Sequence, residues 1–123
     1  MTYPTTIADP KTIAEEYIAL WNEDDAGRRR RMIADGWSTE ARYVDPLMAG
    51  DGPEGVANMI DAVRDRFPGH GFVLEGVADG HGPFVRFSWT LGGPDGSRVI
   101  SGTDMVRLDR EGRIAEVVGF LDA

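Results

Sequence analysis

The sequence contains no cysteine, only two histidines and no long run of apolar residues. The absence of cysteine excludes disulfide bonds, thiolate chemistry and cysteine metal sites. The histidines, His70 and His81, do not stand at metal-ligand spacing, and no glycine-rich phosphate loop precedes a predicted helix. We therefore expect neither a metal nor another cofactor.

Segments that would direct the chain to a membrane are also missing. No apolar stretch approaches the roughly 20 residues that a membrane-spanning helix needs. The N-terminal stretch MTYPTTIADP has neither the basic start nor the apolar core of a signal peptide. We expect no membrane partner and a cytoplasmic location.

Positive charge is scarce, because 13 Lys and Arg residues stand against 21 Asp and Glu residues and the formal net charge is −8. Binding a polyanion requires clustered positive charge. The basic run Arg28 to Arg31 lies on a predicted helix beside Glu23, Asp24, Asp25 and Asp35. We interpret it as a solvated face with local ion pairs, and we expect no nucleic-acid partner.

The remaining composition fits one globular domain. The chain has 123 residues, of which 41% are hydrophobic and 28% charged, so it can bury a core and is not a disordered chain. We expect residues 1–8 to form a loose N-terminal tail and residues 9–123 to form a single domain.

Three helices are predicted in the N-terminal half. Asp9-Pro10 is a typical helix start, and apolar residues then recur at helical spacing as far as Trp21. A second, shorter helix ends near Gly36. A third begins at residues 51–54 and carries an apolar stripe that ends at Phe67.

Strands follow in the C-terminal half. The pattern predicts a short edge strand at about 41–45 and four longer strands at 72–78, 84–91, 97–108 and 113–121. Helices followed by an antiparallel meander indicate an α+β fold rather than the alternation of a parallel sheet. We expect a curved sheet wrapped around the helices, with a cavity between the layers.

Two polar side chains fall on faces that the apolar pattern predicts to be buried. Asp104 shares one face of its strand with Val106 and Leu108, because side chains alternate along a strand. An unpaired buried carboxylate is costly, so Asp104 either has a partner such as Arg86 or takes up a proton and donates a hydrogen bond. Tyr17, on the inward stripe of the first helix, either bonds to backbone or points into the cavity.

Asp45, in the stretch YVDP at residues 43–46, also has two interpretations. An Asp before Pro is biased toward an extended conformation and often opens a turn. The alternative is a carboxylate that acts as a base in an apolar pocket at the end of a strand.

Three segments carry a family resemblance: EEYIALWNEDD (15–25), ARYVDPLMAGDGPEGVANMI (41–60) and SGTDMVRLDREGRIAEVVGF (101–120). With them, nearly the whole chain resembles the nuclear-transport-factor-2-like superfamily, in its SnoaL-like, polyketide cyclase and ketosteroid isomerase branch. The resemblance implies a cone-shaped, cystatin-like roll, with three N-terminal helices on a strongly curved, mostly antiparallel sheet that encloses a pocket. It also implies a homodimer.

The resemblance to ketosteroid isomerase implies roles for three residues. The general base of that pattern lies in a V-x-D-P corner, here Asp45, and its oxyanion tyrosine lies in the first helix, here Tyr17 in YIALWN. Its protonated aspartic acid precedes the last turn, here Asp104 in DMVRLD. The pattern identifies no second tyrosine to support Tyr17.

Other residues remain alternatives. His81 is either an exposed turn residue or the acid or base, while Arg86 either holds a substrate carboxylate or pairs with Asp104 or Glu75. Eight residues are expected to form an apolar pocket wall: Trp21, Met48, Met59, Phe67, Phe87, Trp89, Met105 and Phe120.

Two functions compete at this point. The first is a cofactor-free enzyme of isomerase or cyclase type, which transfers protons within a small apolar carbonyl compound held in the cavity. The second is a non-catalytic module of the same fold that binds a ligand or dimerises. The two are separated by whether Asp45, Tyr17 and Asp104 point into one enclosed apolar cavity.

Overall fold

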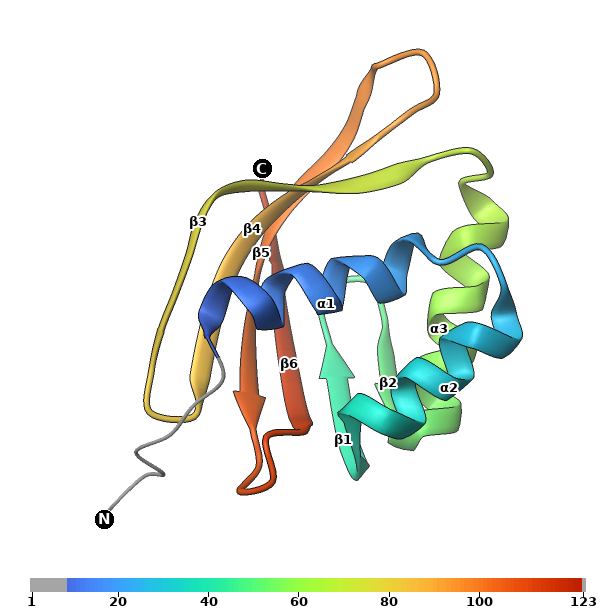
Figure 1. The fold of residues 1–123 in the computed structure, drawn as a ribbon. Coiled ribbons are helices and arrows are strands. Elements are labelled where there is room, and N and C mark those ends of the chain that lie inside the picture. The colour runs from blue at the N-terminus through green and yellow to red at the C-terminus, as the bar shows by residue number, and fades with distance from the viewer. Residues whose placement is uncertain (1–8, 123) are drawn as a thin grey trace.

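The computed structural model describes residues 9–122 and contains three helices and one six-stranded sheet (Figure 1). The helices are α1 (Pro10–Asn22), α2 (Ala26–Gly36) and α3 (Gly52–Arg66). The strands are β1 (Trp37–Val44), β2 (Ala49–Asp51), β3 (Gly71–His81), β4 (Phe84–Gly92), β5 (Arg98–Leu108) and β6 (Ile114–Leu121). This confirms the predicted α+β class, while the predicted tail at residues 1–8 lies outside the described residues.

Local sequence signals explain where α1 begins and how it is fixed to the sheet. The Asp9 side chain accepts a hydrogen bond from the Thr12 amide at 3.2 Å, and Pro10 needs no amide partner in the first turn. At the other end, the Asn22 amide group donates to the Phe72 carbonyl at 2.9 Å and accepts from the Phe72 amide at 2.8 Å. These bonds tie the end of α1 to β3.

The sheet runs in the order β2-β1-β6-β5-β4-β3. All neighbouring strands are antiparallel except β1 and β6, which are parallel, so the sheet is mostly antiparallel as predicted. The expectation of an edge strand at 41–45 is wrong, because β1 begins at Trp37 and lies between β2 and β6. The short strand β2 was not predicted, since Ala49-Gly50-Asp51 is too brief to show an alternating pattern.

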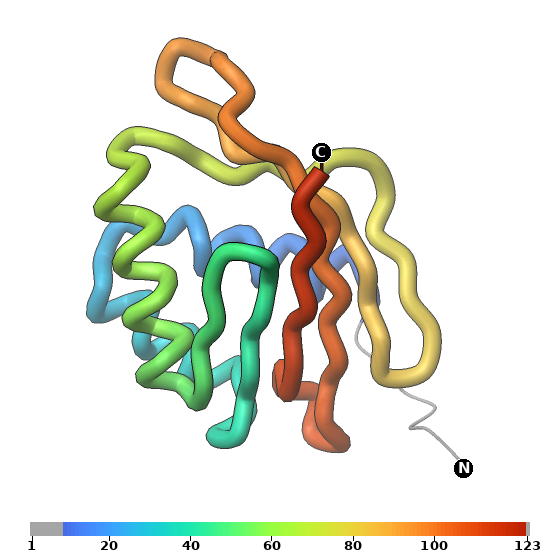
Figure 2. Tube along the Cα trace, turned by 180° about the vertical axis from the view of Figure 1, so that it is seen from behind, coloured from blue at the N-terminus to red at the C-terminus, as the bar shows by residue number. Residues whose placement is uncertain are grey.

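The helices cover one face of the sheet, with α1 packed on β3 and β4 and α3 packed on β1 and β2. Figure 2 shows the opposite face, over which no helix passes. The parity predicted for β5 is confirmed, because Asp104, Val106 and Leu108 are buried on the helix side. Ser and Thr side chains face outward and form cross-strand pairs, such as Ser88 with Thr103 at 2.7 Å between oxygens.

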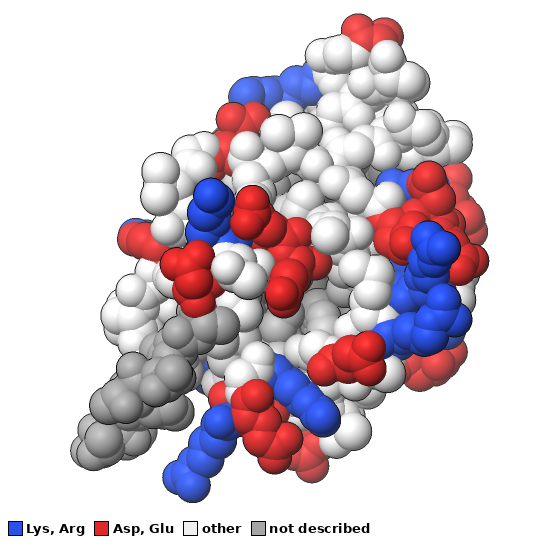
Figure 3. All heavy atoms as spheres, in the orientation of Figure 1, with Lys and Arg blue, Asp and Glu red and all other residues white. Residues whose placement is uncertain are grey.

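The basic run of α2 is paired with acidic side chains, as Figure 3 shows by the mixed charges on that side of the molecule. Arg28 lies 3.6 Å from Glu23, and Arg29 and Arg30 contact Asp61 on α3 at 2.8 and 3.0 Å. Arg29 departs from the predicted solvated face, because it is 4% exposed and joins α2 to α3. Among the described residues, no helix is both long and apolar enough to cross a membrane.

Candidate functional site

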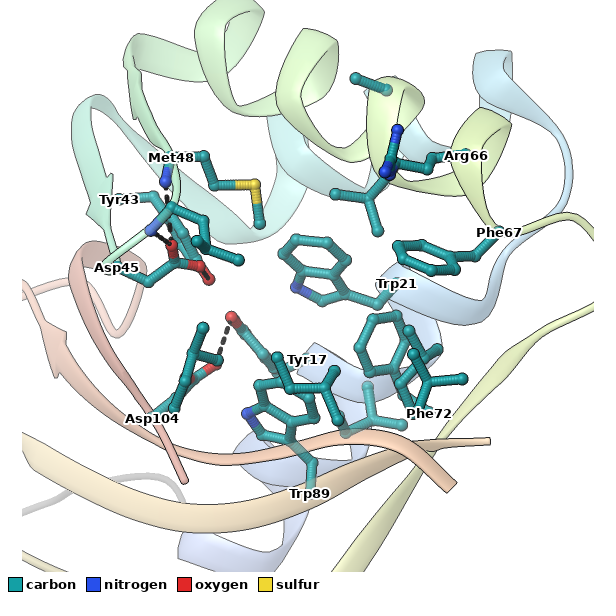
Figure 4. A pocket seen from close by; sticks show the side chains of 18 residues that line it. Tyr17, Trp21, Tyr43, Asp45, Met48, Arg66, Phe67, Phe72, Trp89 and Asp104 are labelled. Atoms are coloured by element: carbon teal, nitrogen blue, oxygen red, sulfur yellow. Dashed lines mark hydrogen bonds between the residues drawn. The ribbon is translucent and has the colours of Figure 1, made fainter. Parts of the chain in front are cut away.

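A cavity of about 410 Å³ lies between α1, α3 and the inner face of the sheet (Figure 4). Its wall is mostly apolar and includes Trp21, Met48, Phe67, Phe72 and Trp89. The volume is within the usual range for sites that enclose a small organic molecule, roughly 300–1,000 Å³. Most of the hydrogen-bonding groups gather at one end of this apolar space.

The first polar pair at that end joins α1 to β5. The Tyr17 hydroxyl donates a hydrogen bond of 2.7 Å to Oδ2 of Asp104, and both residues are 2% exposed. The second carboxyl oxygen of Asp104, Oδ1, is buried without a hydrogen-bond partner. A buried oxygen in this position is costly unless it carries a proton or meets a ligand.

Burial raises the pKa of Asp104 from its ordinary value of 3.8 to about 6. The hydrogen bond from Tyr17 and the nearby Trp89 indole oppose this shift, and the nearby charge of Asp45 adds to it. Burial, and then the charge of Asp104, holds the pKa of Tyr17 well above its usual value near 10. Asp104 therefore changes charge near neutral pH, while Tyr17 stays protonated.

The second polar pair lies at the end of β1. The Tyr43 hydroxyl donates to Oδ2 of Asp45 at 2.7 Å, and the amides of Leu47 and Met48 donate to Oδ1 at 2.7 and 3.0 Å. Asp45 is half-buried and lines the cavity. It thus opens a turn and faces the cavity at once, so the two interpretations of YVDP are compatible.

Sequence reasoning missed Tyr43. Its hydroxyl supports Asp45, and burial raises the pKa of Tyr43 above its usual value, so this tyrosine also stays protonated. A signal was present in the sequence, because the strand expected at 41–45 places Tyr43 two residues before Asp45 and therefore on the same face. The Tyr43 hydroxyl thus donates to Asp45, while the Tyr17 hydroxyl donates to Asp104.

The two pairs converge around Gly119 of β6, which lies opposite Asp104 in the sheet. A methyl group at Gly119 would lie 2.8 Å from Oδ1 of Asp104, 3.1 Å from Cβ of Asp45 and 3.5 Å from the Tyr43 hydroxyl. Glycine in a strand interior often marks such a close approach. The missing side chain at Gly119 leaves room for both carboxyl groups at one end of the cavity.

Two tryptophans bring further donors to the cavity wall. The indole nitrogens of Trp21 and Trp89 are buried without a hydrogen-bond partner of normal geometry. The Trp89 indole is close enough to Asp104 to lower its pKa, and Figure 4 shows its nitrogen turned toward that carboxyl. The Trp21 indole acts in the same way on Tyr17, whose pKa it lowers against the effect of burial.

Four of the eight expected wall residues line the cavity and four do not. Trp21, Met48, Phe67 and Trp89 line it. The expectation is wrong for Met59, Phe87, Met105 and Phe120.

The physical reasons differ among these four residues. Met59 and Phe87 are buried in the packed core, where the centroid of the Phe87 ring lies 5.0 Å from the centroid of the Tyr17 ring. Met105 and Phe120 are sequence neighbours of the inward-facing Asp104 and Gly119, so alternation turns them toward the outer face. Phe120 is accordingly 60% exposed.

The alternative polar residues lie outside the cavity. Arg86 is exposed and pairs with Asp79, with Nε–Oδ1 and Nη2–Oδ2 distances of 3.1 and 2.8 Å, so the partner of Asp104 is Tyr17 and not Arg86. His81 is exposed at the end of β3. Within residues 9–122, no group of three His, Cys, Asp or Glu side chains is placed to hold a metal ion.

Comparisons with known proteins agree with this architecture. The family model described as SnoaL-like domain matches residues 14–117. A proposed isomerase of the SnoaL-like family from Agrobacterium tumefaciens strain C58 is 57% identical, with a TM-score of 0.89 over 91% of this chain and 96% of that chain. No curated protein gives a significant match.

More distant solved structures share the fold. A proposed SnoaL-like polyketide cyclase from Jannaschia sp. CCS1 has a TM-score of 0.72 at 19% identity, over 97% of this chain and 92% of that chain. A SnoaL-like protein of unknown function from Burkholderia thailandensis E264 has a TM-score of 0.76 at 13% identity, over 98% and 100% of the two chains. At these identities the likeness concerns the fold alone.

Proposed function

The chain belongs to the SnoaL-like family, and from that premise we propose that it is a cofactor-free enzyme that moves protons within an apolar carbonyl compound, as an isomerase or a cyclase does. The observation that carries this proposal is the pair of Tyr–Asp contacts, Tyr17–Asp104 and Tyr43–Asp45, at one end of the apolar cavity. The relative from Agrobacterium, named a proposed isomerase, supports the same class of reaction.

Asp45 is the proposed base. It removes a proton from the carbon next to the substrate carbonyl, and the electron pair of that C–H bond moves to the carbonyl oxygen as an enolate. The Leu47 and Met48 amides and the Tyr43 hydroxyl fix the orientation of the carboxylate. Such positioning favours proton transfer because base and substrate need not find each other in water.

Asp104 is the proposed donor to the developing oxyanion. In its neutral form, which the pKa of about 6 makes accessible, a proton on the unpartnered Oδ1 can be donated to the substrate oxygen. Tyr17 already donates its single proton to Oδ2, so it orients Asp104 in the resting site. One such donor in a water-poor site contributes on the order of 3 kcal/mol to transition-state stabilisation.

The same carboxyl group, Asp45, completes the proposed catalytic cycle. Protonated Asp45 returns its proton to another carbon of the enolate, which gives isomerisation, and atoms and charge balance with no external reagent. A cyclase would instead let the enolate carbon attack a second carbonyl of the same molecule, with the proton passed to the new alkoxide. Both reactions need one base and one oxyanion site in an apolar enclosure.

The proposal is tested with a Δ5-3-ketosteroid, whose isomerisation creates a conjugated enone that absorbs in the ultraviolet. We expect wild-type turnover and a loss of at least about a hundredfold in Asp45→Asn, which keeps the shape but removes the base. His81→Asn is the matched control and should retain the wild-type rate. Equal rates for wild type and Asp45→Asn would contradict the assigned base, and a loss in His81→Asn would reassign it.

A further inference from the structure

One cationic side chain lines the cavity. Of the eighteen lining residues, only Asp45 and Asp104 carry a carboxyl group and only Arg66 carries a guanidinium. Arg66 belongs to the last turn of α3 and is exposed. In the view of Figure 4 it lies on the far side of the Trp21 indole from Asp104, so the cavity has carboxyl groups toward one end and a guanidinium toward the other.

Arg66 has no acidic partner of its own. Of the twelve arginines, all within residues 9–122, seven form ion pairs with Asp or Glu, and Arg66 is not among them. Its neighbour Arg64, in the same helical turn, donates to the His70 carbonyl at 3.2 Å and pairs with Asp24. Arg64 therefore serves the end of α3, while the guanidinium of Arg66 is free to bind a ligand.

The surrounding charge decides which ligand fits. A planar guanidinium recognises carboxylates and related oxyanions through two parallel hydrogen bonds. The protein has a net charge of −8, and Asp45 repels an anion from the other end of the cavity. An anionic group can therefore be accommodated only beside Arg66, which places the rest of the ligand toward the Tyr–Asp pairs.

We propose that the cavity binds an amphiphilic carbonyl compound that carries a carboxylate, with the carboxylate at Arg66 and the carbonyl at Asp104. This inference rests on the proposed function and names the substrate class. The apolar stretch between the two ends, formed by Trp21, Phe67 and Phe72, contacts the hydrocarbon part of the ligand. Arg66 thus strengthens the binding of acids relative to neutral ketones, which the apolar cavity still accepts, and sets the direction in which an acidic substrate enters the site.

The test uses two fluorescent probes of the same skeleton, the anionic anilinonaphthalene sulfonate and the neutral phenyl-naphthylamine. Arg66→Met should weaken binding of the sulfonate about five- to tenfold and change binding of the neutral probe less than twofold. The matched control is Arg110→Met, an exposed arginine in the β5–β6 turn outside the cavity, which should change neither. Val63→Trp, which fills the cavity, should weaken both probes and so verify where they bind.

The outcomes separate this inference from the function on which it depends. Equal weakening of both probes by Arg66→Met would overturn the anionic subsite, since the residue would then contribute packing alone. If that result came with steroid turnover lost in Asp45→Asn, the proposed function would stand and only the carboxylate specificity would fall. Failure of wild-type protein to bind either probe, with steroid turnover still lost in Asp45→Asn, would overturn the amphiphile site and leave the proposed base in place.

Discussion

The Asp104 carboxyl combines deep burial, one short hydrogen bond from Tyr17 and one oxygen with no partner. Burial disfavours the charged form, and this outweighs the hydrogen bond that favours it, so the pKa rises. A structural ion pair would have shifted the pKa the other way. The proton that Asp104 takes up near pH 6 is the one that the proposed mechanism uses as a hydrogen-bond donor.

The raised pKa of Asp104 predicts a pH-dependent stability. Between about pH 4 and pH 6 the folded protein holds a proton on Asp104 that the unfolded chain has released, so this residue's contribution to the free energy of unfolding decreases as pH rises. A shift from 3.8 to about 6 corresponds to a loss of about 3 kcal/mol by pH 7.5. Asparagine at position 104 does not titrate, so the free energy of unfolding of Asp104→Asn should lack this pH-dependent contribution.

Urea unfolding of wild type and Asp104→Asn at pH 4.5 and pH 7.5 measures how the free energy of unfolding of each protein changes with pH. Other carboxylates titrate in both proteins, so the quantity to compare is the change with pH in wild type minus the change in Asp104→Asn. We expect wild type to lose stability relative to the variant as pH rises. Parallel behaviour of the two proteins would contradict the assignment of a raised pKa to this residue.

At the scale of elements, the site depends on where β1, β5 and β6 approach one another. Asp45 follows β1, Asp104 belongs to β5 and Gly119 lies opposite Asp104 on β6. The two carboxyl groups can approach each other across β6 only if the strand residue between them has no side chain. Gly119 meets this need, because a Cβ there would overlap the Asp104 carboxyl.

Gly119→Ala should therefore destabilise the protein by about 1–3 kcal/mol and disturb the Tyr17–Asp104 hydrogen bond, as an added methyl does in a tightly packed interior. Gly36→Ala is the matched control, because a Cβ at Gly36 meets no atom within 4 Å at the end of α2. It should be neutral or slightly stabilising. Thermal unfolding of both variants checks this, and a neutral Gly119→Ala would contradict the close approach.

Sequence patterns predicted most elements because these elements have clear periodicity. Three helices with capping signals and four long strands were predicted with small errors at their ends, and the parity of β5 placed Asp104 correctly on the inner face. The short β2 and the interior position of β1 were not predicted, because strand order depends on contacts between distant segments. The sequence pattern contains no direct measure of those contacts.

The candidate site was less predictable than the fold. Tyr17, Asp45 and Asp104 come together as the family resemblance implied, yet Tyr43 was missed although strand alternation indicates its face. Phe87 and Met59 were assigned to the cavity because an inward apolar side chain can face either a cavity or a packed core. Only three-dimensional packing distinguishes the two.

At the scale of the whole molecule, the sheet face without helices is the main uncovered surface (Figure 2). Phe120 is 60% exposed there, beside Met105 and the outward Ser and Thr side chains. We propose that two chains associate through this face, as the family resemblance implied. An exposed aromatic side chain beside Met105 on an open sheet face suits a self-complementary contact.

Light scattering after gel filtration tests this proposal. Two chains of 13.5 kDa each should elute as one particle of twice that mass. Phe120→Asp should shift the protein toward the monomer, because a charge in a closed interface is left without solvent. Val77→Asp, at a β3 residue that is 92% exposed, is the control and should remain dimeric. A monomeric wild-type protein would contradict the proposal.

Transfer of deuterium from heavy water into the carbon next to the carbonyl of beta-tetralone, followed by proton NMR, tests the central claim most directly. This exchange requires only a base and an oxyanion site, so it does not depend on which product the natural reaction forms. The account predicts exchange well above the buffer rate with wild-type protein and at least a hundredfold slower exchange, about the contribution of one base, with Asp45→Asn. Exchange at the same rate with both proteins would contradict it.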